Sequence, residues 1–112
     1  MRCMSNSNQF LPQVSFSILL ALSLRERHGY EIIQQVQVDS GGRVRLGPGA
    51  LYASLHKLTR DGLVAEVEGD GNERRRYYRI TPEGLTRLGA ELAFYEYSVH
   101  ISKQRLTGEA GV

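Results

Sequence analysis

The fold is decided by residues 47–85, which read GPGALYASLHKLTRDGLVAEVEGDGNERRRYYRITPEGL. The first part of this stretch predicts a helix that begins near Pro48, because proline fits the first helical turn and Gly47 is a tolerable cap. Gly62 stands where a left-handed helix stop is expected. The predicted buried stripe of this helix consists of Leu51, Leu55 and Leu58.

The rest of the stretch predicts a β-hairpin followed by a long helix. Residues 63–68 and 74–80 read as strands, and the glycine-rich segment 69–72 between them is typical of a turn. Residues 81–83, Thr-Pro-Glu, form a strong helix start, because threonine caps the first turn, proline fits it and the carboxylate complements the helix dipole. This last helix is expected to run to about Leu106.

Upstream of this stretch the pattern predicts two helices and one short strand. The helices cover residues 12–26 and 29–39, residues 40–42 end the second helix with two glycines, and residues 43–46 alternate as in a strand. This order of elements is that of a winged helix-turn-helix, an α+β fold that is mainly α. The side chains expected to face the core are Phe16, Leu19, Leu20 and Leu24 in the first helix, and Tyr30, Ile33 and Val36 in the second.

The length, charge and composition of the chain limit the classes of protein to which it can belong. With 112 residues, a net charge of +2 and a pI near 8.9, the chain fits one small and mildly basic domain. Cys3 is the single cysteine, which excludes an internal disulfide and suits a reducing cytoplasm. The apolar segment 18–24 is too short to span a bilayer and lacks a signal-peptide cleavage site, so we expect a cytoplasmic protein without a membrane partner.

The sequence carries no motif for catalysis, metal binding or cofactor binding. Cys3 has no CxxC partner, and His28, His56 and His100 lie far apart in the sequence. There is no nucleophile–base pair, phosphate-binding glycine loop or carboxylate pair. We therefore expect no enzyme, no cofactor and no metal, and we expect His28 to make a local hydrogen bond beside the second helix.

Several short stretches of the chain follow one another in a characteristic order and spacing: ILLAL (18–22), HGYEI (28–32), GALY (49–52), LHKL (55–58), DGLV (61–64) and RRYYRITPEG (75–84). Together they resemble the PadR family of bacterial regulators. The resemblance implies a DNA-binding dimer, usually a repressor, that pairs through C-terminal helices, and the length after Thr81 is similar to the short branch of the family with one such helix. Ala53, where proline is common in the family, and Thr59, where an acidic residue is frequent, depart from the pattern on the helix that begins near Pro48.

The helix after Pro48 is the expected DNA-reading helix. With its leucines inward, the outward set includes Tyr52, Ser54, His56 and Lys57, and such side chains reach base edges or phosphates in the major groove. The helix N-terminus also attracts phosphate. The alternative is that Tyr52 packs against the second helix and that Lys57 is an ordinary solvated charge. The predicted DNA contacts on this helix are Gly49, Tyr52, Ser54 and Lys57.

The returning strand of the hairpin is the densest cationic segment of the chain. Arg74, Arg75 and Arg76 follow the glycine-rich turn, and we predict that they contact phosphates or the minor groove. Alternation along a strand places Arg74 and Arg76 on the face opposite Arg75, so they cannot all face DNA. Tyr78 is expected in the core. The alternative is a charged edge strand that prevents aggregation.

The last helix carries apolar residues spaced alternately three and four apart, as in a heptad repeat. We call this row of residues the seam: Leu85, Leu88, Leu92, Tyr95 and Val99. Leu85 and Leu88 lie close enough to the hairpin to join the domain core, whereas the apolar residues beyond them have little of their own domain to pack on. A second copy would cover them, and a two-fold homodimer would place two reading helices about 34 Å apart on a palindromic operator. The predicted dimer contacts are Leu88, Leu92, Phe94, Tyr95 and Val99, with Tyr97 and Ile101 widening the apolar face.

These patterns divide the chain into four segments. We expect a flexible N-terminal tail over residues 1–11, a DNA-binding domain over 12–81, a dimerisation helix over 82–107 and a short tail over 108–112.

The predicted function is a sequence-specific regulator that binds double-stranded DNA. The family resemblance also allows a small-molecule effector, whose pocket would lie between subunits beside Phe94, Tyr95 and Tyr97. The alternative function is a winged-helix module that binds another protein and not DNA. The arginine-rich hairpin argues against that alternative, because the cores of protein interfaces are depleted in charge.

Overall fold

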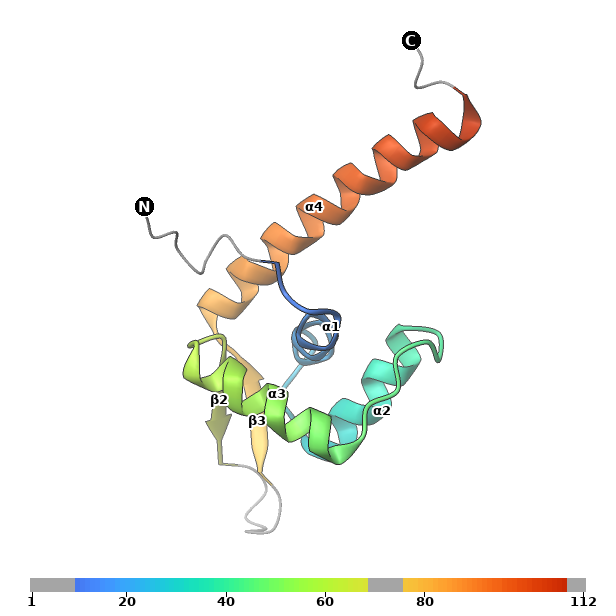
Figure 1. Ribbon diagram of the computed structural model, residues 1–112. Coiled ribbons are helices and arrows are strands. Elements are labelled where there is room, and N and C mark those ends of the chain that lie inside the picture. The colour runs from blue at the N-terminus through green and yellow to red at the C-terminus, as the bar shows by residue number, and fades with distance from the viewer. Residues whose placement is uncertain (1–9, 69–75, 109–112) are drawn as a thin grey trace.

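The computed structural model describes residues 10–68 and 76–108. These residues form a three-helix unit, a small sheet and one long helix that projects from them, which confirms the predicted winged helix-turn-helix (Figure 1). The elements are α1 (Gln13–Leu22), β1 (Arg27–His28), α2 (Gly29–Asp39), α3 (Pro48–Arg60), β2 (Val64–Val67), β3 (Tyr77–Ile80) and α4 (Pro82–Thr107).

The core surrounds α1, which Figure 1 views almost end-on between α2, α3 and α4. The predicted leucine stripe of α3 is fully buried and packs in the same cluster as the apolar face of α1. Each such leucine or isoleucine contributes roughly 1.5–3 kcal/mol when it leaves water. The residues with almost no exposed surface are Ile18, Leu19, Leu22, Ile32, Val36, Leu51, Leu55 and Val64.

The hairpin is part of a three-stranded antiparallel sheet in the order β1-β3-β2. In its register Val64 lies opposite Ile80 and Val67 lies opposite Tyr77. Tyr78 is buried in the core, as predicted. Gly62, just before β2, has a φ of 80°, the left-handed conformation that the sequence predicted at the end of α3.

The strand predicted at residues 43–46 was wrong, and the third strand of the sheet is β1. Arg27 is buried there, pairs with Tyr78 and donates its Nε to the carbonyl oxygen of Ala21 at 3.0 Å, at the end of α1. This bond ties β1 to the end of α1, and β1 pairs with the side of β3 that β2 does not occupy. Val44 instead donates its amide to Ser40 Oγ at 2.9 Å, a local turn that leaves residues 43–46 without a partner strand.

Three details near α1 and α2 also differ from the prediction. The first helix ends at Leu22 and not near residue 26, and Leu24 beyond it is exposed. Tyr30 is exposed, because Gly29, Ile32 and Val36 form the buried face of α2. Leu11, which we placed in the N-terminal tail, is buried, so the folded unit begins before residue 12.

Thr81 joins the sheet to α4 and fastens both to the end of α3. Its Oγ1 donates to the carbonyl oxygen of Gly62 at 2.7 Å and accepts from the amide of Gly84 at 3.0 Å, which is the predicted helix cap. Its amide donates to the carbonyl oxygen of Leu63 at 3.1 Å. The first turn of α4 is therefore bonded directly to the turn between α3 and β2.

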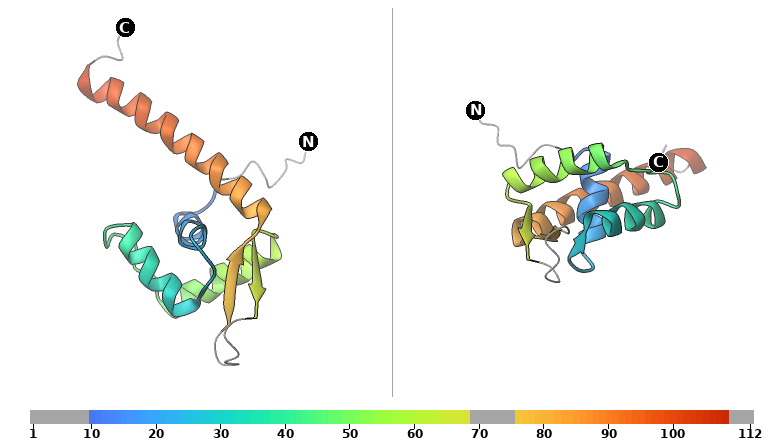
Figure 2. Two further views of the ribbon diagram at one scale, coloured as in Figure 1. Left: turned by 180° about the vertical axis from the view of Figure 1, so that it is seen from behind. Right: turned by 90° about the horizontal axis from the view of Figure 1, so that it is seen from below.

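We divide α4 into an inner half, Pro82–Glu91, and an outer half, Leu92–Thr107. Gly84 in the inner half lies so close to the backbone of Leu63 that a β-carbon would overlap its carbonyl oxygen. Glu91 is only 5% exposed, and its Oε2 accepts the amide of Leu11 at 3.3 Å, just before α1 begins. The outer half extends away from the domain, as two further views show (Figure 2).

Candidate nucleic-acid interface

The outward face of α3 is lined by small residues at its start and polar residues at its end. Counting about 3.6 residues per turn from the buried leucines places Gly49, Ala53, His56 and Arg60 on the opposite side of the helix. All four are exposed, and no atom lies within 4 Å of the position that a Gly49 β-carbon would take. Another surface can therefore approach the backbone of α3 closely at its first two turns.

Tyr52 lies on the flank of α3 that faces the start of α2, and it combines both roles that the sequence left open. It is 47% exposed, yet its phenol ring packs against the backbone of Gly29. A β-carbon on Gly29 would overlap the Tyr52 hydroxyl oxygen and would lie 3.0 Å from Cζ. The predicted contact with the second helix is thus present, and the remaining ring surface is open to solvent.

The other predicted residues of α3 lie on different sides of the helix. Lys57 is exposed, and together with Arg60 it lines a cavity of about 840 Å³ between the start of α1, the end of α3 and the start of α4. Ser54 is half-buried and Gly49 is exposed. The four predicted DNA contacts of α3 are therefore spread around the helix and do not share one face.

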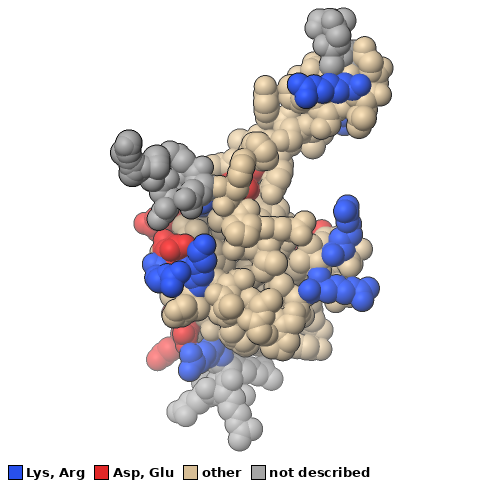
Figure 3. Space-filling model, viewed as in Figure 1, with Lys and Arg blue, Asp and Glu red and all other residues tan. Residues whose placement is uncertain are grey.

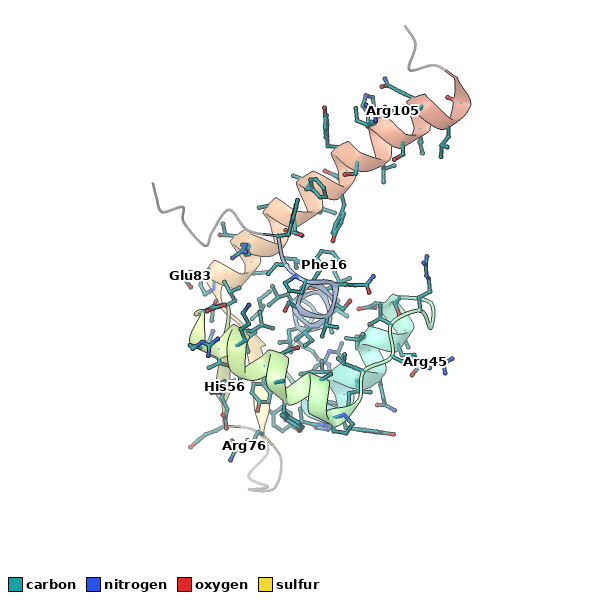
Figure 4. The ribbon with its side chains drawn as sticks, in the orientation of Figure 1. Phe16, Arg45, His56, Arg76, Glu83 and Arg105 are labelled. Atoms are coloured by element: carbon teal, nitrogen blue, oxygen red, sulfur yellow. The ribbon has the colours of Figure 1, made fainter. Side chains whose placement is uncertain are left out.

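At the hairpin, the structure describes Arg76 of the three predicted arginines. Arg76 is exposed at the start of β3, and its Nε lies 3.8 Å from Glu66 Oε2 on the neighbouring strand β2. Figure 4 labels Arg76 at this end of the sheet and His56 on α3. Arg74 and Arg75 lie outside the described residues.

The Tyr78 phenol, at the base of the hairpin, has a raised pKa. Burial raises the pKa of the Tyr78 phenol, and the nearby Glu66 carboxylate and Tyr52 phenol raise it further. A hydrogen bond to Arg76 acts in the opposite direction. Tyr78 of β3 therefore lies within electrostatic reach of both the hairpin arginine and the tyrosine of α3.

His28 makes the predicted local hydrogen bond, as the cap of α2. Its Nδ1 accepts the amide of Glu31, and the Glu31 carboxylate accepts the amide of His28 at 3.2 Å. Burial alone would raise the pKa of Glu31, but this bond and the neighbouring Arg25 guanidinium hold it below its ordinary value. The His28 ring also packs edge-on against Tyr77 at 5.4 Å between centroids, which ties the start of α2 to β3.

Cations at both ends of α3 were missed by the sequence analysis. Arg43 and Arg45 are exposed in the loop before the helix, and Arg60 is exposed in its last turn. Lys and Arg side chains gather near each end of α3 in the space-filling view (Figure 3), and Figure 4 labels Arg45 beside the loop. The sequence could have indicated these arginines by their place just before α3 and in its last turn, because cations beside a helix that reads DNA can reach phosphates.

The burial of the predicted seam residues of α4 differs between the inner and outer halves of the helix. Leu88 is half-buried and packs against the core of its own domain. Leu85, which we expected near the core, is half exposed. Leu92 and Val99 are 51% and 52% exposed and do not belong to the apolar core formed by the described residues.

Two aromatic residues of the seam contact the N-terminal part of the chain. The Phe94 ring lies 4.9 Å from the Phe10 ring, and the Tyr95 ring packs edge-on against Phe16 of α1 at 5.1 Å, both measured between centroids. These contacts support the beginning of the outer half, while Tyr97 remains largely exposed.

In the described ranges, 10–68 and 76–108, no three histidine, cysteine or acidic residues cluster closely enough to hold a metal ion. None of the described helices combines the length and the apolar character needed to cross a membrane.

Residues 18–90 match the model of the "Transcriptional regulator PadR-like family". A transcriptional regulator of Mycobacterium tuberculosis is 38% identical over 76 residues, which are 67% of this chain and 68% of that protein. A solved transcriptional regulator from Clostridium thermocellum, 26% identical, superimposes with a TM-score of 0.70 over 81% of this chain and 90% of its own.

A PadR-like transcription factor from Bacteroides fragilis, also 26% identical, gives a TM-score of 0.67 over 81% of this chain and 87% of its own. The matched family consists of transcriptional regulators and not of enzymes. The chain belongs to the PadR-like family of transcriptional regulators.

Proposed function

We propose that the protein is a repressor that binds a palindromic operator as a homodimer, with α3 in the major groove and the hairpin arginines on nearby phosphates. The observation that carries this proposal is the outward face of α3. Gly49 and Ala53 allow close approach to base edges, and His56 and Arg60 follow on the same side. Cations before and after the helix are placed to contact the flanking backbone.

The homodimer is supported by the outer half of α4. Leu92 and Val99 leave half of their surface exposed on a helix that extends beyond its own domain. Apolar side chains repeated along such a helix are typical of a helix–helix interface. A two-fold axis through this half would place the two copies of α3 on successive turns of one face of DNA, about 34 Å apart.

The test is DNA binding measured by fluorescence anisotropy, with the DNA upstream of the protein's own gene, a scrambled duplex of equal length and two salt concentrations. We expect the upstream DNA to be preferred. If a dimer neutralises about six phosphates, the affinity should fall with a log–log salt slope near −5. A flat salt dependence would contradict phosphate contact.

Two arginine variants localise the interface on the molecule. Arg60→Ala removes a cation from the outward face of α3 and should weaken binding and make the salt slope shallower by about one. Arg105→Ala removes the same charge from the outer half of α4, far from α3 (Figure 4), and should leave both unchanged. Absence of binding to any duplex at low salt would favour the protein-interaction module instead.

A further inference from the structure

We propose that Gly29 is a positioning residue for DNA reading: its lack of a side chain lets the Tyr52 ring pack on the start of α2 and thereby fixes the rotation of α3 about its own axis. This inference rests on the proposed function. It assigns a role to a buried residue outside the reading helix, and it changes the predicted role of Tyr52 from direct contact to support.

The need for glycine at this position comes from its neighbours and not from its backbone. Gly29 is the first residue of α2, and its φ is not positive. An alanine would therefore suit its backbone conformation. Its β-carbon, however, would overlap the Tyr52 hydroxyl oxygen, and would lie 3.0 Å from Tyr52 Cζ and 3.1 Å from Leu51 Cδ2. Leu51 can shift at its flexible end, whereas the rigid phenol has to move as a whole.

The Tyr52 ring connects α3 to α2. It projects from α3 and rests on Gly29, the first residue of α2, where Leu51 of the buried stripe also lies. The outward residues of α3 are thus set relative to α2 by one aromatic side chain.

A small rotation of α3 is enough to disturb base reading. Side-chain tips on a helix lie about 5–6 Å from its axis, so a rotation of about 15° moves them by roughly 1.5 Å. A hydrogen bond to a base edge does not survive a displacement of that size. Phosphate contacts through long arginine side chains are more tolerant, because the flexible stems can follow.

The experiment is a double-mutant cycle on purified full-length protein, with Gly29→Ala, Tyr52→Phe and the double variant. The readout is the ratio of affinities for the upstream DNA and the scrambled duplex, together with the salt slope. Gly29→Ala should lower the ratio about tenfold while keeping the salt slope, since one misplaced base contact has an effect of that order. The double variant should recover most of the discrimination of Tyr52→Phe alone, because removing the hydroxyl oxygen relieves the severe overlap and leaves only the tight 3.0 Å approach to Cζ.

Two further measurements separate positioning from folding. Gly89→Ala makes the same change on α4, where no atom lies within 4 Å of the new β-carbon, and should leave the ratio unchanged. Tyr52→Leu removes the phenol while Gly29 is intact, and should lower the ratio as Gly29→Ala does. In the wild type, an NMR cross-peak between the Tyr52 ring protons and the Gly29 α-protons should report the contact without any DNA.

The outcomes are distinct for the two proposals. The inference is overturned if Gly29→Ala discriminates like the wild type, if the double variant is no better than Gly29→Ala, or if the cross-peak is absent. A wild-type protein that binds no duplex would overturn the proposed function and with it a role in DNA reading, while the cross-peak would still report whether Tyr52 packs on Gly29.

Discussion

The inner and outer halves of α4 belong to one continuous helix but have opposite surroundings. In the inner half, Gly84 touches the backbone of Leu63 and Glu91 accepts the amide of Leu11, so the helix is part of the domain. In the outer half, Leu92 and Val99 remain half exposed. The local sequence therefore forms one continuous helix, whereas the surroundings bury side chains of the inner half and leave Leu92 and Val99 of the outer half exposed.

The largest expected effect comes from two glycines on this helix. Gly84→Ala should lower the free energy of unfolding by about 3 kcal/mol, because its β-carbon would overlap the backbone of Leu63, which cannot move aside. Gly89→Ala meets no atom within 4 Å and should raise it by up to about 1 kcal/mol through helix propensity. Urea unfolding of both variants measures the difference, and equal values would refute the close packing of Gly84 against the backbone of Leu63.

A charge in the outer half should break the proposed dimer and leave the domain folded. Leu92→Asp is expected to weaken self-association roughly 100-fold, about 2.7 kcal/mol, because it buries an unpaired carboxylate in an apolar contact. Light scattering over a range of concentrations measures this, with circular dichroism as the check on folding. His100→Asp adds the same charge on another flank of the helix and should remain dimeric; a dimer that tolerates Leu92→Asp would place the interface elsewhere.

Replacing one glutamate in each half of α4 compares how much the two halves contribute to stability. Glu91→Ala leaves the buried amide of Leu11 without its acceptor and should cost about 1–2 kcal/mol in urea unfolding. Glu96→Ala, at an exposed position of the outer half, should change stability by less than about 0.5 kcal/mol. If both variants were equally stable, the bond between α4 and the start of α1 would contribute nothing in solution.

The smallest effect is a pH dependence confined to the domain. The pKa of Glu31 is lowered in the folded protein, so its ionised form stabilises the fold above the ordinary value of 4.5, and that contribution is lost as the pH falls through the lower folded value. Glu31→Gln should therefore be less stable than the wild type by about 0.5–1 kcal/mol near neutral pH, the range of a capping contact, and the difference should shrink below pH 4. Thermal melts at a series of pH values test this, and a difference that grows with acid would have the wrong sign.

Elements with strong local signals could be predicted from the sequence. The leucine stripe of α3, the left-handed Gly62 and the cap at Thr81 depend on residues a few positions apart, and the structure confirms each of them. The prediction of a strand at residues 43–46 was wrong, because alternating polar and apolar residues do not by themselves provide a neighbouring strand to pair with. The edge of β3 is taken by Arg27 and His28, which the buried Arg27 guanidinium holds in place.

The candidate site was harder to predict, because it depends on how α3 is rotated and on what lies beside it. Helical spacing identified Tyr52 as an outward residue, but only the fold brings its ring onto Gly29 from another helix. Arg43 and Arg45 flank α3 across a loop, and no periodicity within the helix marks them. Among the apolar residues of the outer half, Leu92 and Val99 remain half exposed, because a helix of this length extends beyond a small core. Phe94 and Tyr95, which we expected to lack cover within their own domain, instead pack against Phe10 and Phe16.

The junction at Thr81 gives the molecule the mechanics of a lever. A single residue separates β3 from α4, and its bonds to Gly62 and Leu63 make the end of α3, the hairpin and the start of α4 turn together. The arm has 26 residues, so it is about 39 Å long, and a tilt of about 5° at the fulcrum displaces its far end by about 3 Å. In the proposed homodimer, a slight change in the crossing angle of the two α4 helices would therefore move both copies of α3 out of step with the fixed pitch of DNA. Such a change would release the proposed operator while every domain stays folded.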